Sequence, residues 1–157
     1  MEKASEMSHL QAMQCMARLY LKGKHVSKDE RKAVQLLKKC AELRDGRSCY
    51  ELYRYYHEHS TEKTNEKYYL DLAAKLNVSE AQYDLAMLYY NNATDADYQK
   101  AFSLFTNAAN NGEPCAYYQL ALCYRFGHGV PKDMTKAMNM LSEAAKLGHA
   151  EAKRIIG

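Results

Sequence analysis

A nine-residue phrase occurs four times along this chain, and a second helical phrase follows each copy. The phrase ends at Tyr20, Tyr56, Tyr89 and Tyr124, so its copies are 36, 33 and 35 residues apart. Two helix-type phrases per unit, repeated at such a period, mark stacked helical hairpins. The sequence therefore predicts an all-α fold: an α/α superhelical solenoid of four helical hairpins with a short C-terminal capping helix.

The first phrase places apolar or small residues on one face of a helix. In the third copy these are Ala81, Leu85, Ala86 and Tyr89, at the spacing of an amphipathic helix. We expect helices at about 9–22, 28–44, 47–59, 63–76, 80–92, 96–110, 114–126 and 132–147, and a cap at about 150–155. Residues 1–7 are expected to be disordered or frayed. The repeat domain, 8–157, divides into repeats at about 8–46, 47–79, 80–114 and 115–150 with a cap at 151–157.

The second phrase carries paired small residues that let helices approach closely. We expect Ala109 and Ala145 to be tightly packed for this reason. The second hairpin departs most from the pattern, because Tyr53 replaces an alanine of the first phrase and Glu66 replaces an alanine of the second. Larger side chains at close-contact positions disturb packing, so this hairpin should be the irregular one.

Residues that end helices fall at the expected boundaries. Ser27 with Glu30, and Ser79 with Gln82, have the spacing of a capping box. Gly112 and Gly148 follow second helices, where a left-handed backbone favours glycine.

Composition restricts the class of protein. The net charge is +3, too small to indicate a nucleic-acid partner. No apolar run reaches the roughly 18 residues that a membrane span needs, and the polar start lacks the apolar segment of a signal peptide. We expect a cytoplasmic monomer without a membrane span.

The five cysteines are an odd number on a chain with no export signal, which favours free, buried thiols. Cys40 and Cys49 are the candidate pair for a disulfide, because they lie near the facing ends of two antiparallel helices. No cysteine and histidine spacing indicates a metal site.

The fourth unit resembles the Sel1-like repeat, a relative of the tetratricopeptide repeat. The inner turn of that family matches Gly127, Gly129, Val130, Pro131, Lys132 and Asp133, and its closing motif matches Ala144, Ala145, Leu147, Gly148 and Ala152. The first unit has a weaker turn, with His25 in place of the second glycine. The resemblance covers about residues 8–155 and implies an adaptor for protein complexes. Cys40 and Cys49 also resemble the pairs that join hairpins in a secreted, cysteine-rich branch of the family, although only one unit here has such a pair.

No catalytic, nucleotide-binding or cofactor-binding motif is present. The sequence therefore predicts a non-enzymatic adaptor or scaffold that needs no cofactor and binds a partner protein or peptide through a concave face. The alternative is an exported, cysteine-rich protein with weak enzymatic or small-ligand-binding activity. If first helices line the concave face, aromatic, Met and basic residues would contact the partner. These residues are Arg18, Lys22, Tyr50, Arg54, Tyr83, Met87, Tyr90, Tyr118, Leu122 and Arg125.

Two of these assignments have simpler alternatives. Tyr50, Tyr83 and Tyr118 would serve equally well as packing residues of the repeat. Arg18, Lys22 and Arg54 lie on adjacent first helices and could together receive a carboxylate, or could be ordinary solvated charges.

Overall fold

The computed structural model describes residues 2–23, 25–59 and 63–157. It contains two compact units, Met1–Leu76 and Asn77–Gly157. Within the described ranges every regular element is a helix, which confirms the all-α prediction.

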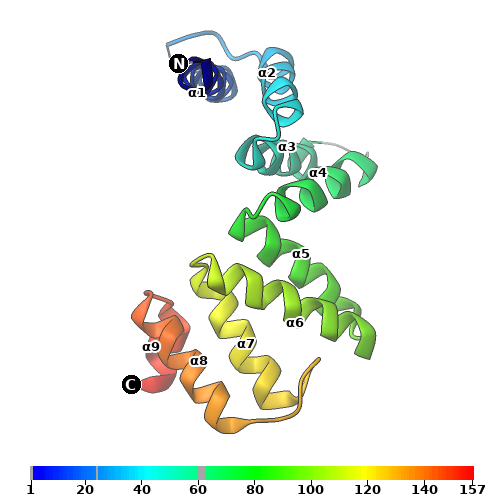
Figure 1. Ribbon diagram of the computed structural model, residues 1–157, viewed down its shortest axis with the longest axis vertical. Helices are drawn as coiled ribbons and strands as arrows, with labels where there is room; N and C mark the ends of the chain where they lie inside the picture. Colours follow the sequence, from blue (N-terminus) through cyan, green and yellow to red (C-terminus); the bar gives the residue numbers. More distant parts are fainter. Residues whose placement is uncertain (1, 24, 60–62) are drawn as a thin grey trace. The chain divides into compact units, whose positions relative to one another are not determined.

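Unit 1 consists of two antiparallel hairpins (Figure 1). Helix α1 (Glu2–Lys22) pairs with α2 (Glu30–Glu42), and α3 (Gly46–His59) pairs with α4 (Lys63–Lys75). Helix α2 also packs against α3, so the hairpins stack.

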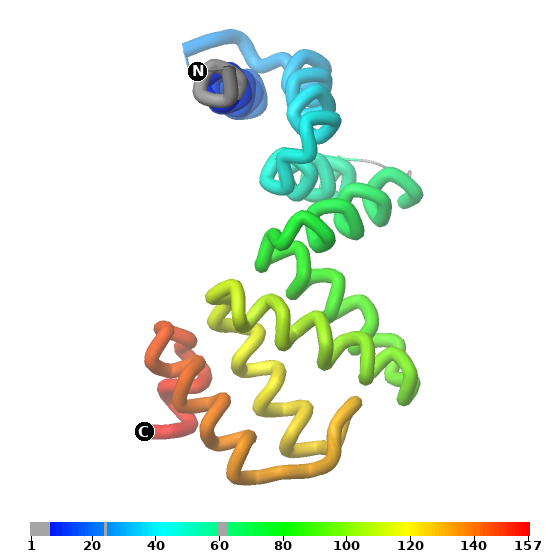
Figure 2. Tube along the Cα trace, viewed as in Figure 1, coloured from blue at the N-terminus to red at the C-terminus, as the bar shows by residue number. Residues whose placement is uncertain are grey.

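Unit 2 repeats this arrangement. Helix α5 (Ser79–Asn92) pairs with α6 (Asp95–Asn110), and α7 (Pro114–Phe126) pairs with α8 (Met134–Lys146). Helix α6 packs against α7, and the short helix α9 (Ala150–Ile156) packs against α8. The tube in Figure 2 follows the chain from α7 through a long turn into α8.

The first helix is longer than expected. Helix α1 begins at Glu2, because Glu2, Lys3 and Ala4 are strong helix formers. The frayed state expected for residues 1–7 stays a prediction, and Met1 lies outside the described residues.

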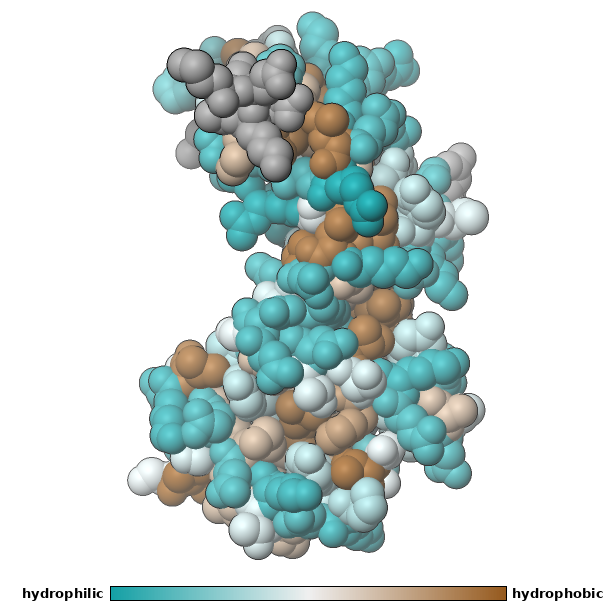
Figure 3. Space-filling view, in the orientation of Figure 1, coloured by the Kyte–Doolittle hydropathy of each residue, from teal (hydrophilic) through white to brown (hydrophobic). Residues whose placement is uncertain are grey.

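Small residues of the repeated phrases form the buried core, as their spacing predicts. Ala17, Ala86 and Ala121 of the first phrase are at most 1% exposed. Phe105 is fully buried and belongs to the core cluster of unit 2, together with Leu120 and Cys123. On the face drawn in Figure 3, hydrophilic side chains cover most of the helices, and hydrophobic ones emerge between them in several small areas.

Side-chain caps fix the starts of the second helices. Asp29 accepts a hydrogen bond from the Lys32 amide, and Asp133 accepts one from Lys136. The expected capping role of Ser27 is wrong, because Asp29 lies directly before α2. The expected role of Ser79 is also wrong, because α5 begins at that residue after Val78, which makes no side-chain cap. Gly112 and Gly148 have φ of 88° and 97°, which confirms left-handed helix ends.

The turn between α7 and α8 recurs between α1 and α2. The Asp133 amide donates to the Tyr124 carbonyl at 2.9 Å, and the Asp29 amide donates to the Tyr20 carbonyl at 3.1 Å. His25 has φ of 67°, close to the 72° of Gly129. The first hairpin therefore keeps the backbone of the turn although a histidine replaces its second glycine.

Candidate functional site

Three of the predicted basic residues line one cleft in unit 1. Arg18 and Lys22 come from the last turns of α1, and Arg54 comes from α3. The cleft has a volume of about 600 Å³. Its lining residues are Arg18, Leu21, Lys22, Lys28, Glu30, Glu51, Arg54, Tyr55, Glu58 and His59. Arg18, Lys22 and Arg54 thus line one cleft, and their role in binding a partner stays a prediction.

Some of the charged side chains in this cleft form ion pairs, and others do not. The Arg18 Nε lies 3.8 Å from Glu51 Oε1, a long contact between partly exposed side chains. The Lys28 Nζ lies 2.7 Å from Glu30 Oε1, and this contact lowers the pKa of Glu30 and raises that of Lys28. Among the described residues, Lys22 and Arg54 have no ion-pair partner.

Aromatic side chains form one wall of the cleft. The rings of Tyr55 and His59 stack with their centres 4.8 Å apart, and His59 Nδ1 lies 3.1 Å from the Tyr55 carbonyl oxygen. The Tyr55 hydroxyl donates to Glu30 at 3.5 Å. Burial, and secondly the Glu30 carboxylate, raise the pKa of Tyr55. The contact of Tyr55 with Glu30 joins α3 to the start of α2, which the repeat does not reveal. The stack of Tyr55 on His59 has the i, i+4 spacing of one helix face, which was an available signal.

In unit 2, the predicted tyrosines pack within the fold. The Tyr83 ring lies 5.8 Å from Phe105, and the Tyr118 ring stacks on His149 at 4.6 Å. Burial is the main cause that raises the pKa of Tyr83. Tyr90 contacts both Phe105 and His128. The packing alternative therefore describes these side chains, and nothing in the structure tests whether they also contact a partner.

The remaining predicted residues differ in exposure. Met87 and Leu122 are half-buried, and Arg125 is exposed with its guanidinium carbon 5.3 Å from the Phe126 ring centre. In unit 1, Tyr50 is half-buried with its ring 5.6 Å from that of Tyr53, and Tyr50 is outside the cleft lining.

Cys40 and Cys49 lie at the junction of α2 and α3, fully buried, and the structure has both as free cysteines. Burial raises the pKa of both thiols, that of Cys49 to about 11. The predicted pairing stays a prediction for solution experiments.

A lysine above the repeat tyrosine is a feature that sequence reasoning missed. The Lys32 and Lys136 ammonium groups each lie 5.6 Å from the ring centres of Tyr20 and Tyr124. Lys100 lies 5.2 Å from the ring of Tyr89. Such cation–π contacts contribute on the order of 0.5–1 kcal/mol at exposed sites. The constant interval of 12 residues from Tyr20 to Lys32 and from Tyr124 to Lys136 was the available signal.

Residues 2–23, 25–59 and 63–157 contain neither a metal site nor a membrane-spanning helix. No group of three or more His, Cys, Asp or Glu side chains is placed to hold a metal ion there. In the same ranges no helix has the length and apolar character to cross a membrane.

Known proteins share both the sequence pattern and the fold. The chain is 40% identical over 80 residues to an uncharacterized protein of Neisseria meningitidis, covering 51% of this chain and 17% of that protein. It is also 40% identical over 84 residues to DAP3-binding cell death enhancer 1 of Rattus norvegicus, covering 54% of this chain and 16% of the relative. The chain thus spans about a sixth of the length of these relatives.

A solved Sel1 repeat protein from Oxalobacter formigenes is similar with a TM-score of 0.82 and 27% identity, covering 91% of this chain and 59% of that one. The model of the Sel1 repeat matches residues 11–45, 79–113 and 116–149. The unmatched residues between the first two copies contain most of the second hairpin, whose sequence departs most from the pattern. These matches show that the chain belongs to the Sel1 repeat family, whose members are generally scaffolds for protein interactions.

Proposed function

We propose that this protein is a non-enzymatic adaptor that binds a single carboxylate of a partner protein in the cleft between α1 and α3. The observation that carries the proposal is the convergence of Arg18, Lys22 and Arg54 on one cleft, where Lys22 and Arg54 have no ion-pair partner among the described residues. Solvated charges need not converge in this way. The printed name of the rat relative describes a protein that binds another protein, which supports the general role.

The cleft fits one carboxylate better than a run of acidic residues. Arg54 can hold a carboxylate through two parallel hydrogen bonds, and Lys22 adds a point charge. Glu51 and Glu58 also line the cleft and would repel a second negative charge. The stacked Tyr55 and His59 rings offer an apolar surface beside that carboxylate. The partner segment is therefore a single acidic residue or a chain terminus next to an apolar side chain.

In unit 2 the proposal extends to Met87, Leu122 and Arg125, which lie on first helices. Arg125 is exposed there, and its charge has no ion-pair partner among the described residues. Tyr83, Tyr90 and Tyr118 are secondary candidates, because their packing contacts already account for their size.

The test is partner capture from the native host with the full chain, followed by affinity measurement with each purified partner. We expect Arg54→Glu and Lys22→Glu to weaken binding at least about tenfold, because each replaces an attraction by a repulsion. Lys67→Glu is the matched control, since Lys67 is an exposed lysine of α4 outside the cleft. If Lys67→Glu loses the partner while both cleft variants keep it, the proposal fails.

A further inference from the structure

A groove lies between α1 and α2, separate from the cleft between α1 and α3. We propose that it docks an amphipathic helix of a partner protein, with apolar residues on one face of that helix and acidic residues beside them. The groove has a volume of about 400 Å³. Its lining residues are His9, Ala12, Met13, Met16, Tyr20, Lys32, Gln35, Leu36 and Lys39. None of them belongs to the cleft between α1 and α3.

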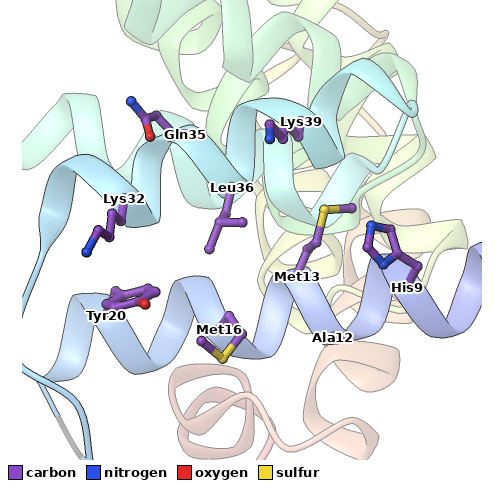
Figure 4. Close-up of a pocket in the computed structure, with 9 residues that line it drawn as sticks. All are labelled: His9, Ala12, Met13, Met16, Tyr20, Lys32, Gln35, Leu36 and Lys39. Atoms are coloured by element: carbon purple, nitrogen blue, oxygen red, sulfur yellow. The ribbon is translucent and has the colours of Figure 1, made fainter.

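The floor of this groove is apolar. Figure 4 shows Leu36 pointing from α2 toward α1, and Met13 pointing from α1 toward α2. Met16 is 39% exposed, while Met13, Tyr20 and Leu36 are half-buried. Methionine side chains adapt their shape and are common on surfaces that bind helices.

The α7–α8 hairpin of unit 2 has a face that corresponds to the groove between α1 and α2, and there that face is covered. The repeat register places Leu120 at the position of Met16, Tyr124 at that of Tyr20, and Met140 at that of Leu36. In unit 2, helix α6 covers this face: Leu120 is 4% exposed and belongs to one apolar cluster with Phe105 of α6, and the partly buried Met140 packs against that cluster.

An aromatic contact completes this cover. The ring of Phe102, also on α6, meets the Tyr124 ring edge to face at 5.5 Å. This surface of the repeat therefore already packs against a helix with large apolar residues three positions apart. A helix of the same kind fits the groove between α1 and α2.

The charges around the groove determine which helix fits. Its basic side chains are Lys32, Lys39 and His9, and among the side chains that the structure describes no acidic residue lines it. Lys32 lies 3.4 Å from Asp29, whereas Lys39 is exposed and has no ion-pair partner in the described part of the chain. The repeat position of Lys39 is occupied in unit 2 by Glu143, on the face that α6 covers. The helix that fits unit 1 should thus carry acidic residues on the flank next to Lys39.

The test uses two synthetic helical peptides and the full chain. Both are about 14 residues long, or four turns, with leucine at positions i, i+3, i+4 and i+7. One has glutamate on both flanks of the leucine stripe and the other has lysine. In fluorescence polarisation at low salt we expect the glutamate peptide to bind at least about tenfold more tightly. Added salt should reduce this difference.

Two pairs of variants and one single variant locate the peptide. Leu36→Glu should weaken binding about tenfold, whereas Leu88→Glu should not, since Leu88 is an exposed leucine of unit 2. Lys39→Glu should weaken binding of the glutamate peptide, and its control is Lys153→Glu in α9. Because Lys39 is exposed, Lys39→Glu should fold normally, so it still tests the proposal if Leu36→Glu does not fold. Arg54→Glu separates this surface from the α1–α3 cleft and should leave peptide binding unchanged.

Several results would overturn the proposal. The first is that the two peptides bind equally tightly. The second is that Leu36→Glu and Lys39→Glu both bind the glutamate peptide as tightly as the unmodified chain does. The third is that Arg54→Glu weakens peptide binding as much as those two variants do. Sedimentation of the chain alone tests another occupant. A dimer that Leu36→Glu dissociates would show that a second copy covers the groove, and the proposal of an acidic partner helix would then be wrong.

Discussion

The Tyr90 hydroxyl lies 2.7 Å from Nδ1 of His128, a contact that ties the last turn of α5 to the turn between α7 and α8. The His128 ring also stacks on Tyr98 of α6, with ring centres 4.1 Å apart and planes 7° from parallel. Burial is the main cause that raises the pKa of Tyr90 to about 12. Tyr90 thus holds two hairpins of unit 2 together, although its position in the repeat indicated a contact with a partner.

Truncation of Tyr90 should destabilise unit 2. Tyr90→Phe removes one hydrogen bond and should cost about 1 kcal/mol. Tyr90→Ala also removes the ring and should cost about 2–4 kcal/mol, toward the lower end of buried aromatic truncations because Tyr90 is only half-buried. Urea unfolding followed by circular dichroism measures both. Tyr68→Ala is the control, since Tyr68 is 60% exposed; an equal loss there would contradict the assignment.

Gly129 should not tolerate a side chain. It has φ of 72°, and a Cβ at this position would overlap the backbone carbonyl of Tyr98. Gly129→Ala should therefore lower the melting temperature by several degrees, because left-handed strain of about 1–2 kcal/mol adds to a clash with backbone. Gly112→Ala separates the two effects, since Gly112 has φ of 88° with no atom within 4 Å of the added Cβ. Equal losses in both variants would mean that the close approach to Tyr98 has no effect.

Ala109 and Ala145 occupy the same position of the repeat but should respond differently to leucine. Ala109 is 3% exposed in the core of unit 2, and Ala109→Leu should cost about 1–3 kcal/mol through overpacking. Ala145 is half-buried, so Ala145→Leu should cost less than half as much. Thermal unfolding of the two variants checks this order. The reverse order would mean that burial does not determine the response.

The repeat phrases were sufficient to predict the core, because the spacing of small residues decides which helix faces can approach. Ala17, Ala86 and Ala121 are buried for this reason. The sequence did not predict that Ala109 is more deeply buried than Ala145, since helix α7 packs against α6 while the smaller α9 packs against α8.

Contacts between distant side chains were not predictable from spacing. Arg18 and Arg54 share a cleft because both lie on first helices, which the period does reveal. The Arg18 contact with Glu51 depends on side-chain rotamers and on how α1 and α3 lie against each other. The stack of His128 on Tyr98 likewise needs the α7–α8 turn to lie against α6, and no repeat signal encodes that placement.

The cysteines should differ in reactivity. Cys15 is exposed, Cys115 is intermediate, and Cys40, Cys49 and Cys123 are buried. Since the thiolate is the reactive form, a thiol reagent should modify Cys15 quickly and the three buried residues only as the protein unfolds. Mass spectrometry of labelled peptides follows each site. Denatured, unreduced protein should show all five thiols, whereas a count of three would show one disulfide.

Stability should fall at alkaline pH because of two buried thiols. Burial raises the pKa of Cys49 to about 11 and that of Cys123 to about 12, from the usual 9.0. Above pH 9 the unfolded chain loses these protons while the folded chain keeps them, so the free energy of unfolding decreases as pH rises. The stability that the two protonated thiols provide is fully present below pH 9. It is lost as pH rises from 9 to about 12, on the order of 1 kcal/mol per thiol for each pH unit.

Urea unfolding between neutral pH and about pH 10 measures this slope. Tyrosines titrate in the same pH range. The comparison between variants therefore separates the loss of stability due to the thiols from the loss due to tyrosines. The double variant Cys49→Ala/Cys123→Ala should have a shallower fall in stability than the unmodified chain, even if its stability at neutral pH is lower. Cys15→Ala is the control for the loss of an exposed thiol. Equal slopes in the double variant and the unmodified chain would mean that the alkaline loss arises from other groups.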